Sequence, residues 1–177
     1  TGTLRGRSTA RHAERLDLAR YVRGVERANM DAPPRVAVIG AGMAGLVCAR
    51  TLADHRLPVV LFDKSRGLGG RLATRRTDSD AFDHGAQYFT ARDPRFRRHV
   101  DAWAERGLLA EWRPTHADEA KSGDAWWVAV PGMSALGRAL GEDVDRRPSC
   151  RVVEVRREGP GWRLVDEVGG DQGWFDA

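Results

Sequence analysis

The residues in this sequence that are best suited to chemistry are three glycines and one aspartate in a fixed order. Gly40, Gly42 and Gly45 have the spacing Gly-x-Gly-x-x-Gly, and Asp63 follows roughly 20 residues later. Gly40 can make a tight turn, Gly42 carries no Cβ that would keep a pyrophosphate away, and Gly45 lets a following helix pack closely on a sheet. The carboxylate of Asp63 suits a ribose hydroxyl. The spacing therefore predicts a dinucleotide-binding site.

Two strands and a helix are needed to position these residues. Val36–Ile39 is a short apolar run, typical of a strand buried on both faces, and Val59–Phe62 is a second run that ends at Asp63. Between them we expect a helix after Gly45, whose free N–H groups and dipole favour phosphate. The alternative is a glycine-rich turn that binds nothing. In that case the position of Asp63 would be a coincidence. The residues expected on the inward face of the helix are Leu46, Val47, Ala49, Leu52 and Ala53.

A second glycine turn, Gly69-Gly70-Arg71, follows Asp63 closely. The two glycines let backbone N–H groups approach an oxyanion, and Arg71 adds a permanent cation whose planar fork suits phosphate. A solvated surface arginine is the alternative interpretation of Arg71. Its place directly after two glycines favours a contact with the nucleotide.

Three segments, in order, resemble a known family. Lys64–Arg71 resembles the element that follows the second strand in flavoproteins of the amine oxidase superfamily. Phe82–Thr90 and Pro131–Leu136 resemble the renalase branch of that superfamily. The resemblance extends from Arg35 to Ala177 and implies a Rossmann-type α/β domain, a parallel sheet with flanking helices, that binds FAD. It disfavours an NAD-dependent dehydrogenase, which has no need of the second glycine turn.

The resemblance also assigns residues to the cofactor. Gln87 and Tyr88 would face the flavin ring, and the backbone of Val152 would meet the adenine end of FAD. Residue type alone favours the alternative, in which Tyr88 is a core aromatic and Gln87 is solvated. No catalytic residue or metal ligand is assigned, and His84 is interpreted as structural. The residues expected to contact FAD are Gly40, Ala41, Gly42, Met43, Ala44, Gly45, Asp63, Lys64, Gly70, Arg71, Gln87, Tyr88 and Val152.

The activity that the resemblance implies is that of a flavin oxidoreductase. A hydride would pass from a small-molecule substrate to the flavin, and oxygen would reoxidise the flavin with release of hydrogen peroxide. The renalase branch implies oxidation of dihydronicotinamide isomers. Two alternatives remain open: an amine oxidase that acts on a small amine, and a nucleotide-binding module without turnover.

Composition limits the other function classes. The 177 residues, 41% hydrophobic and 31% charged, suffice for one domain with a real core. The net charge is +4, but the basic residues are scattered without interleaved aromatic residues, so nucleic acid is not expected as a partner. No apolar run approaches the roughly 20 residues that a membrane span needs. Cys48 and Cys150 have neither a disulfide pattern nor a metal spacing, which favours a reducing cytoplasm.

The expected domain organisation has two parts. Residues 1–29 are arginine-rich with few apolar side chains, and they are interpreted as an extension without a role in the site. Residues 30–177 are expected to form the FAD-binding domain with the start of an inserted β-rich substrate domain. Because the resembled proteins continue with further strands, the sequence is interpreted as the N-terminal portion of a longer protein.

The remaining elements are predicted from caps and periodicity. Asp93 is expected to cap a helix that ends at Gly107, with Phe96, Val100 and Trp103 in the core. The other predicted elements are strands at residues 125–130, 151–155 and 162–165, and a helix at 135–140 that Ser134 would cap and Gly141 would end. Core packing is favoured over a substrate pocket for Trp112, Trp126 and Trp127.

Overall fold

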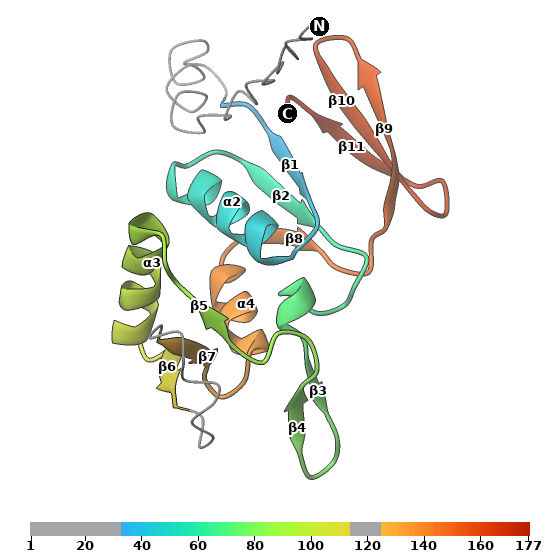
Figure 1. Cartoon of the computed structure of the whole chain (residues 1–177). Coiled ribbons are helices and arrows are strands. Elements are labelled where there is room, and N and C mark those ends of the chain that lie inside the picture. The colour runs from blue at the N-terminus through green and yellow to red at the C-terminus, as the bar shows by residue number, and fades with distance from the viewer. Residues whose placement is uncertain (1–32, 114–124) are drawn as a thin grey trace, which may run out of the picture. The chain divides into compact units, whose positions relative to one another are not determined.

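The computed structural model describes residues 33–113 and 125–177 (Figure 1). The predicted arginine-rich extension, residues 1–29, lies outside the described residues. The chain divides into two units, residues 1–33 and 34–177, and all elements named below belong to the second unit.

A parallel sheet of three strands forms around the two apolar runs. β1 (Val36–Ile39) pairs in parallel with β2 (Val59–Phe62), and β2 pairs in parallel with β8 (Asp145–Arg147). Helix α2 (Met43–Asp54) connects β1 to β2, so this segment is a βαβ unit. All four residues of β2 are buried, as its continuous apolar sequence requires. The predicted Rossmann-type α/β fold is confirmed.

The burial of β1 and α2 differs in part from the prediction. Val36 is buried, but Ile39, at the carboxyl end of β1, is 52% exposed rather than buried on both faces. Its side chain borders a cavity where the strand gives way to the first glycine turn. Helix α2 buries three of its five predicted inward residues, whereas Val47 and Ala53 are only half-buried.

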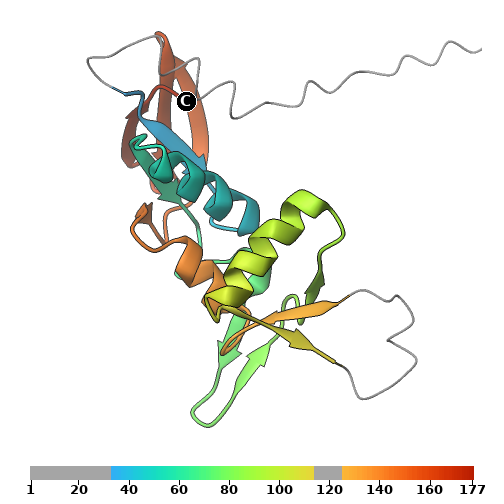
Figure 2. The same cartoon turned by 90° about the vertical axis from the view of Figure 1, so that its left-hand side faces the viewer.

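Smaller antiparallel sheets follow the second glycine turn. The 3-10 turn η1 (Gly70–Leu72) leads into a hairpin of β3 (Thr74–Arg76) and β4 (Ala81–Asp83), which extends away from the parallel sheet in both views (Figures 1 and 2). A second antiparallel sheet has the order β5-β7-β6. Its strands are β5 (Phe89–Thr90), β6 (Leu109–Trp112) and β7 (Trp126–Ala129).

Helix α3 (Pro94–Glu105) has both of its predicted ends. The side chain of Asp93 accepts a hydrogen bond of 2.8 Å from the backbone N–H of Arg95, which caps the helix. The side-chain hydrogen bond from Arg95 also holds the pKa of the Asp93 carboxyl below its usual range. Gly107 follows the helix with a φ of 70°, the left-handed conformation that commonly ends helices.

Helix α4 (Ser134–Leu140) begins one residue earlier than predicted, and Ser134 is not its cap. Met133 occupies the N-cap position, so Ser134 lies in the first turn. Its hydroxyl accepts a hydrogen bond of 2.8 Å from the guanidinium of Arg138 on the same helix. Gly141 is the C-cap, as expected.

The C-terminal strands form an antiparallel sheet that packs on the parallel one. Its order is β11-β10-β9, with β9 (Val152–Glu158), β10 (Gly161–Asp166) and β11 (Asp171–Phe175). The Phe175 ring meets the Phe62 ring edge-to-face with centroids 5.7 Å apart, and Val60 and Leu164 complete the cluster. The predicted hairpin is therefore confirmed, and its inner face shares a core with β2.

We predict that Phe175→Ala lowers the free energy of unfolding by about 3–5 kcal/mol, because it leaves a cavity in this shared core. Phe175 is 0% exposed. Urea unfolding followed by tryptophan fluorescence would measure the loss. Val168→Ala is the control, since Val168 is 85% exposed and its change should stay within about 0.5 kcal/mol. Equal losses in the two variants would contradict the placement of Phe175 in the core.

Candidate functional site

A cavity of about 1120 Å³ lies at the carboxyl end of β1, where α2 begins. Four segments border it: the first glycine turn with the start of α2, the second glycine turn, the chain after β4, and one face of α3. The lining residues are Ile39, Gly40, Gly42, Met43, Ala44, Gly45, Val47, Gly69, Arg71, Leu72, Gly85, Ala86, Phe96, His99 and Trp103.

Each of the three glycines of the first turn has a different structural reason to be glycine. Gly40 has a φ of 103°, which side chains rarely allow. A Cβ on Gly45 would lie 1.9 Å from the carbonyl oxygen of Gly40, so the helix could not approach the turn. Gly42 has an ordinary extended conformation, and a Cβ there would meet nothing within 4 Å. The fold therefore does not require glycine at position 42, whereas a ligand that approaches the backbone does.

The N-terminus of α2 is open to an anion. No side chain caps the helix at Gly42, and its first turn contains no acidic residue. The first N–H groups of a helix have no partner within the helix, and they carry the positive end of its dipole. This end borders the cavity at Met43 and Ala44. The arrangement is therefore suited to phosphate.

The second glycine turn lies against the first, backbone to backbone. The N–H of Gly69 donates to the carbonyl of Ala41 at 2.8 Å, and Gly42 and Gly69 form an isolated parallel bridge. A Cβ on Gly70 would lie 3.2 Å from the Cα of Gly42. This contact brings Arg71 to the cavity. Within residues 33–113 and 125–177, the exposed guanidinium of Arg71 has no hydrogen-bond or ion-pair partner.

Asp63 lies behind the first turn and is not among the residues that border the cavity. One carboxylate oxygen accepts from the backbone N–H of Ala41 at 2.5 Å, and the other accepts from the N–H of Ser65 at 2.7 Å. The carboxylate therefore holds the glycine turn in place, a role that the sequence reasoning missed. Each oxygen has a second lone pair, so a ribose hydroxyl can still donate to it.

One face of α3 forms the apolar wall of the cavity. Phe96, His99 and Trp103 lie on this face. Ile39, at the end of β1, and Leu72, at the end of η1, also border the cavity. The helical spacing of Phe96 and Trp103 predicts that both lie in the core. Trp103 is indeed buried and Phe96 is half-buried, but both also border the cavity. Their spacing with His99, three and then four residues, is the signal that could have indicated this shared face.

The other predicted cofactor residues lie away from this cavity. Lys64 and Gln87 are exposed, and Val152 packs against the core cluster around Phe62. Tyr88 stacks on Trp126 with ring centroids 4.0 Å apart and planes inclined by 2°. Trp112 completes this aromatic cluster and Trp127 lies under Arg97. None of the three predicted tryptophans borders the cavity.

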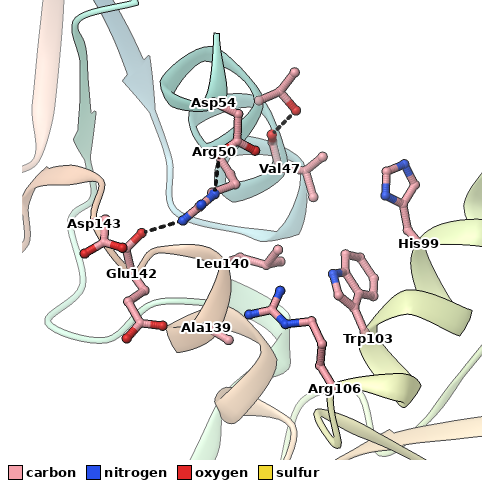
Figure 3. Close-up of a pocket in the computed structure, with 11 residues that line it drawn as sticks. Val47, Arg50, Asp54, His99, Trp103, Arg106, Ala139, Leu140, Glu142 and Asp143 are labelled. Atoms are coloured by element: carbon pink, nitrogen blue, oxygen red, sulfur yellow. Dashed lines mark hydrogen bonds and ion pairs between the residues drawn. The ribbon is translucent and has the colours of Figure 1, made fainter. Parts of the chain in front are cut away.

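A second, smaller cavity of about 330 Å³ lies among α2, α3 and the end of α4 (Figure 3). Val47, His99 and Trp103 border both cavities. Figure 3 shows Arg50 between Asp54, 2.9 Å away, and the carbonyl of Glu142, 3.1 Å away. The described residues that line it include no glycine, so of these two cavities the larger has the backbone cradle for phosphate.

The described residues contain no group of three or more His, Cys, Asp or Glu side chains that could hold a metal ion. In the same part of the chain, every helix is too short or too polar to cross a membrane.

The contrast between Gly42 and Gly45 gives a prediction. Gly42→Ala should weaken FAD binding at least about tenfold, because its Cβ occupies the space that a pyrophosphate needs, while stability falls by no more than about 1 kcal/mol. Titration calorimetry with FAD and thermal unfolding measure the two effects. Gly45→Ala is the matched variant and should destabilise the fold, because its Cβ collides with Gly40. Normal FAD affinity in folded Gly42→Ala would contradict the cradle.

The sequence is similar to those of several known proteins. Residues 38–103 match the NAD(P)-binding Rossmann-like domain family. The chain is 32% identical to renalase of Mus musculus over 147 residues, which cover 76% of this chain and 43% of renalase. It is 42% identical to an L-amino acid oxidase of Cerastes cerastes over 50 residues, which cover 28% of this chain and 10% of that oxidase. The chain thus spans less than half the length of these relatives.

A solved structure agrees with the fold. A protein described as a candidate protoporphyrinogen oxidase from Exiguobacterium sp. 255-15 superposes with a TM-score of 0.61 at 15% identity, over 81% of this chain and 58% of that protein. This likeness concerns the fold alone, whereas the match to renalase extends through most of the present sequence. Through its match to renalase, the chain is similar to the renalase branch of the FAD-dependent amine oxidase superfamily, and residues 38–103 match the Rossmann-like domain that such a protein requires.

Proposed function

We propose that this chain binds FAD in the larger cavity and that the protein is a flavin oxidoreductase. One observation carries the proposal: two glycine turns lie backbone to backbone and bring an open helix N-terminus and an unpaired arginine to one cavity. The residues fit a dinucleotide, because the space in front of Gly42 would be filled by any side chain but admits a pyrophosphate.

In this proposal, the chain's own residues hold the cofactor along its length. The backbone of Gly40–Gly45 and the start of α2 bind the pyrophosphate, and Arg71 adds a cation beside it. Asp63 accepts from a ribose hydroxyl. Following the family resemblance, Val152 meets the adenine end, and Gln87 and Tyr88 lie toward the flavin. The α3 wall, with Phe96 and Trp103, excludes water from that side of the cavity.

The bound flavin would supply the redox chemistry, accepting a hydride from the substrate and passing electrons to oxygen. The substrate we propose is a dihydronicotinamide isomer, which follows from the family resemblance and is supported by the match to mouse renalase. Turnover is proposed for a protein of renalase's length, and FAD binding for this chain. Both cysteines, Cys48 and Cys150, are free, which supports a reducing compartment such as the cytoplasm.

An amine oxidase acting on a small amine is the second candidate. The match to an L-amino acid oxidase favours it, although that match covers only 28% of this chain. A nucleotide-binding module without turnover is the third. These candidates differ in what they consume, so substrate oxidation separates them where FAD binding does not.

We predict that the purified chain retains FAD, seen as a yellow chromophore after desalting, and does not retain NAD. Arg71→Ala should weaken FAD binding about 10- to 100-fold, the effect of losing a charge-assisted hydrogen bond. The midpoint of thermal unfolding should not change, because the side chain has no partner to lose among the described residues. Arg75→Ala on β3, another exposed arginine, is the control and should bind FAD normally. Retention of NAD in place of FAD would overturn the proposal.

We also predict that a protein of full family length releases hydrogen peroxide when given a dihydronicotinamide isomer. The assay couples peroxide to a peroxidase dye and follows bleaching of the flavin in the absence of oxygen. A small primary amine serves as the competing substrate. Peroxide from the amine alone would favour the amine oxidase, and flavin that stays oxidised with either compound would favour the module without turnover.

A further inference from the structure

The end of β4 and the start of α4 are joined by one carboxylate. Asp83, the last residue of β4, accepts from the backbone N–H of Met133, with its two oxygens 3.0 and 3.1 Å away. It also accepts from the hydroxyl of Thr74 at 2.5 Å. The Thr74 hydroxyl in turn accepts from the N–H of Ser134 at 3.0 Å. Thr74 and Asp83, facing each other across the β3–β4 hairpin, thus cap α4 in place of a residue of its own.

The turn before α4 packs closely against the β3–β4 hairpin, and this contact makes the cap possible. A Cβ on Gly132 would lie 3.3 Å from the Thr74 hydroxyl and 3.5 Å from Asp83 Oδ1, so the turn before α4 fits tightly against the pair. Ala135 donates to the carbonyl of Gly132 at 2.8 Å. Every backbone N–H from position 133 to 135 therefore has a partner, and two of the three partners come from the hairpin.

Asp83 connects to Arg71 along two separate routes. Along the chain, Asp83 is followed by the segment that carries Gly85 and Ala86, and the N–H of Ala86 donates to the carbonyl of Arg71 at 2.7 Å. A Cβ on Gly85 would lie 2.0 Å from that same carbonyl oxygen. Gly85 and Ala86 border the cavity, so this route fixes its wall at Arg71.

The second route runs through α4. A Cβ on Gly137 would lie 2.8 Å from the Cα of Gly69, so α4 packs on the second glycine turn at van der Waals distance. Figure 1 shows α4 beside η1, the turn that contains Arg71. Because Asp83 caps α4, it fixes the position at which this helix packs against Gly69. The N–H of Gly69 in turn donates to the carbonyl of Ala41 in the first glycine turn.

We propose that Asp83, supported by Thr74, is the positioning residue of the cavity: it holds Arg71 in place from both sides without bordering the cavity itself. The inference rests on the proposed FAD site for its effect on binding. It does not rest on that site for its effect on the chain, because the hydrogen bonds are present without a ligand.

The test is Asp83→Asn, which keeps the shape but leaves one acceptor oxygen for the Met133 N–H and the Thr74 hydroxyl. We expect FAD affinity to fall about tenfold while the fold is retained, with a shifted visible flavin spectrum that reports a displaced ring environment. Asp80→Asn is the matched control, because Asp80 lies at the tip of the same hairpin and bonds only there. Wild-type affinity and spectrum in Asp83→Asn would overturn the proposal.

A double-mutant cycle with Arg71→Ala tests whether Asp83 acts through Arg71. If it does, Asp83→Asn should have little further effect on FAD affinity once Arg71 is removed. An undiminished tenfold loss in the Arg71→Ala background would show that Asp83 acts elsewhere and would overturn the proposal.

If Asp83→Asn does not fold, Thr74→Val and Thr74→Ser replace it: the serine, which keeps the hydroxyl, should bind FAD as the wild type does, and the valine should not. If the wild-type chain binds no FAD, the proposed function fails. Amide hydrogen exchange then decides the positioning role, since the Ala86 N–H should exchange about tenfold faster in Asp83→Asn than in Asp80→Asn. Equal exchange rates would overturn it.

Discussion

The backbone contact between the two glycine turns is the constraint on which the site depends. The Gly69 N–H donates to the Ala41 carbonyl, and a Cβ on Gly70 would lie only 3.2 Å from the Cα of Gly42. Gly69 and Gly70 also have φ angles of 107° and 55°, a left-handed conformation that glycine adopts without strain. The contact gathers two sources of positive potential, the dipole of α2 and the charge of Arg71, which the sequence keeps well apart.

The electrostatic balance of the first turn includes a negative charge behind it. The carboxylate of Asp63 accepts from the N–H groups of Ala41 and Ser65, so it ties the end of β2 to the turn that follows β1. The same side chain was assigned to the cofactor from its spacing alone. Both hydrogen bonds are present without a nucleotide, so the carboxylate holds the turn in addition to the role proposed for it in binding.

The sequence predicted the parts of the fold whose signals are local. The apolar runs at β1 and β2, the glycine spacing, the cap at Asp93 and the hairpin of β9 and β10 all have such signals. β8 was missed because Asp145–Arg147 is charged and exposed and becomes a strand only by pairing with β2. The cap of α4 was misassigned to Ser134 because its real partners lie in a distant hairpin. The α3 wall of the cavity likewise depends on tertiary placement.

The last two residues of the chain form backbone hydrogen bonds with β1 and the residue before it. Asp176 donates to the carbonyl of Arg35, and the carbonyl of Ala177 accepts from Ala37, so the chain returns to lie along the free side of β1. β1 thus has backbone partners on both sides, β2 on one side and these residues on the other. Open α/β sheets bind ligands in the crevice outside the carboxyl ends of their strands, and the cavity lies at the carboxyl end of β1.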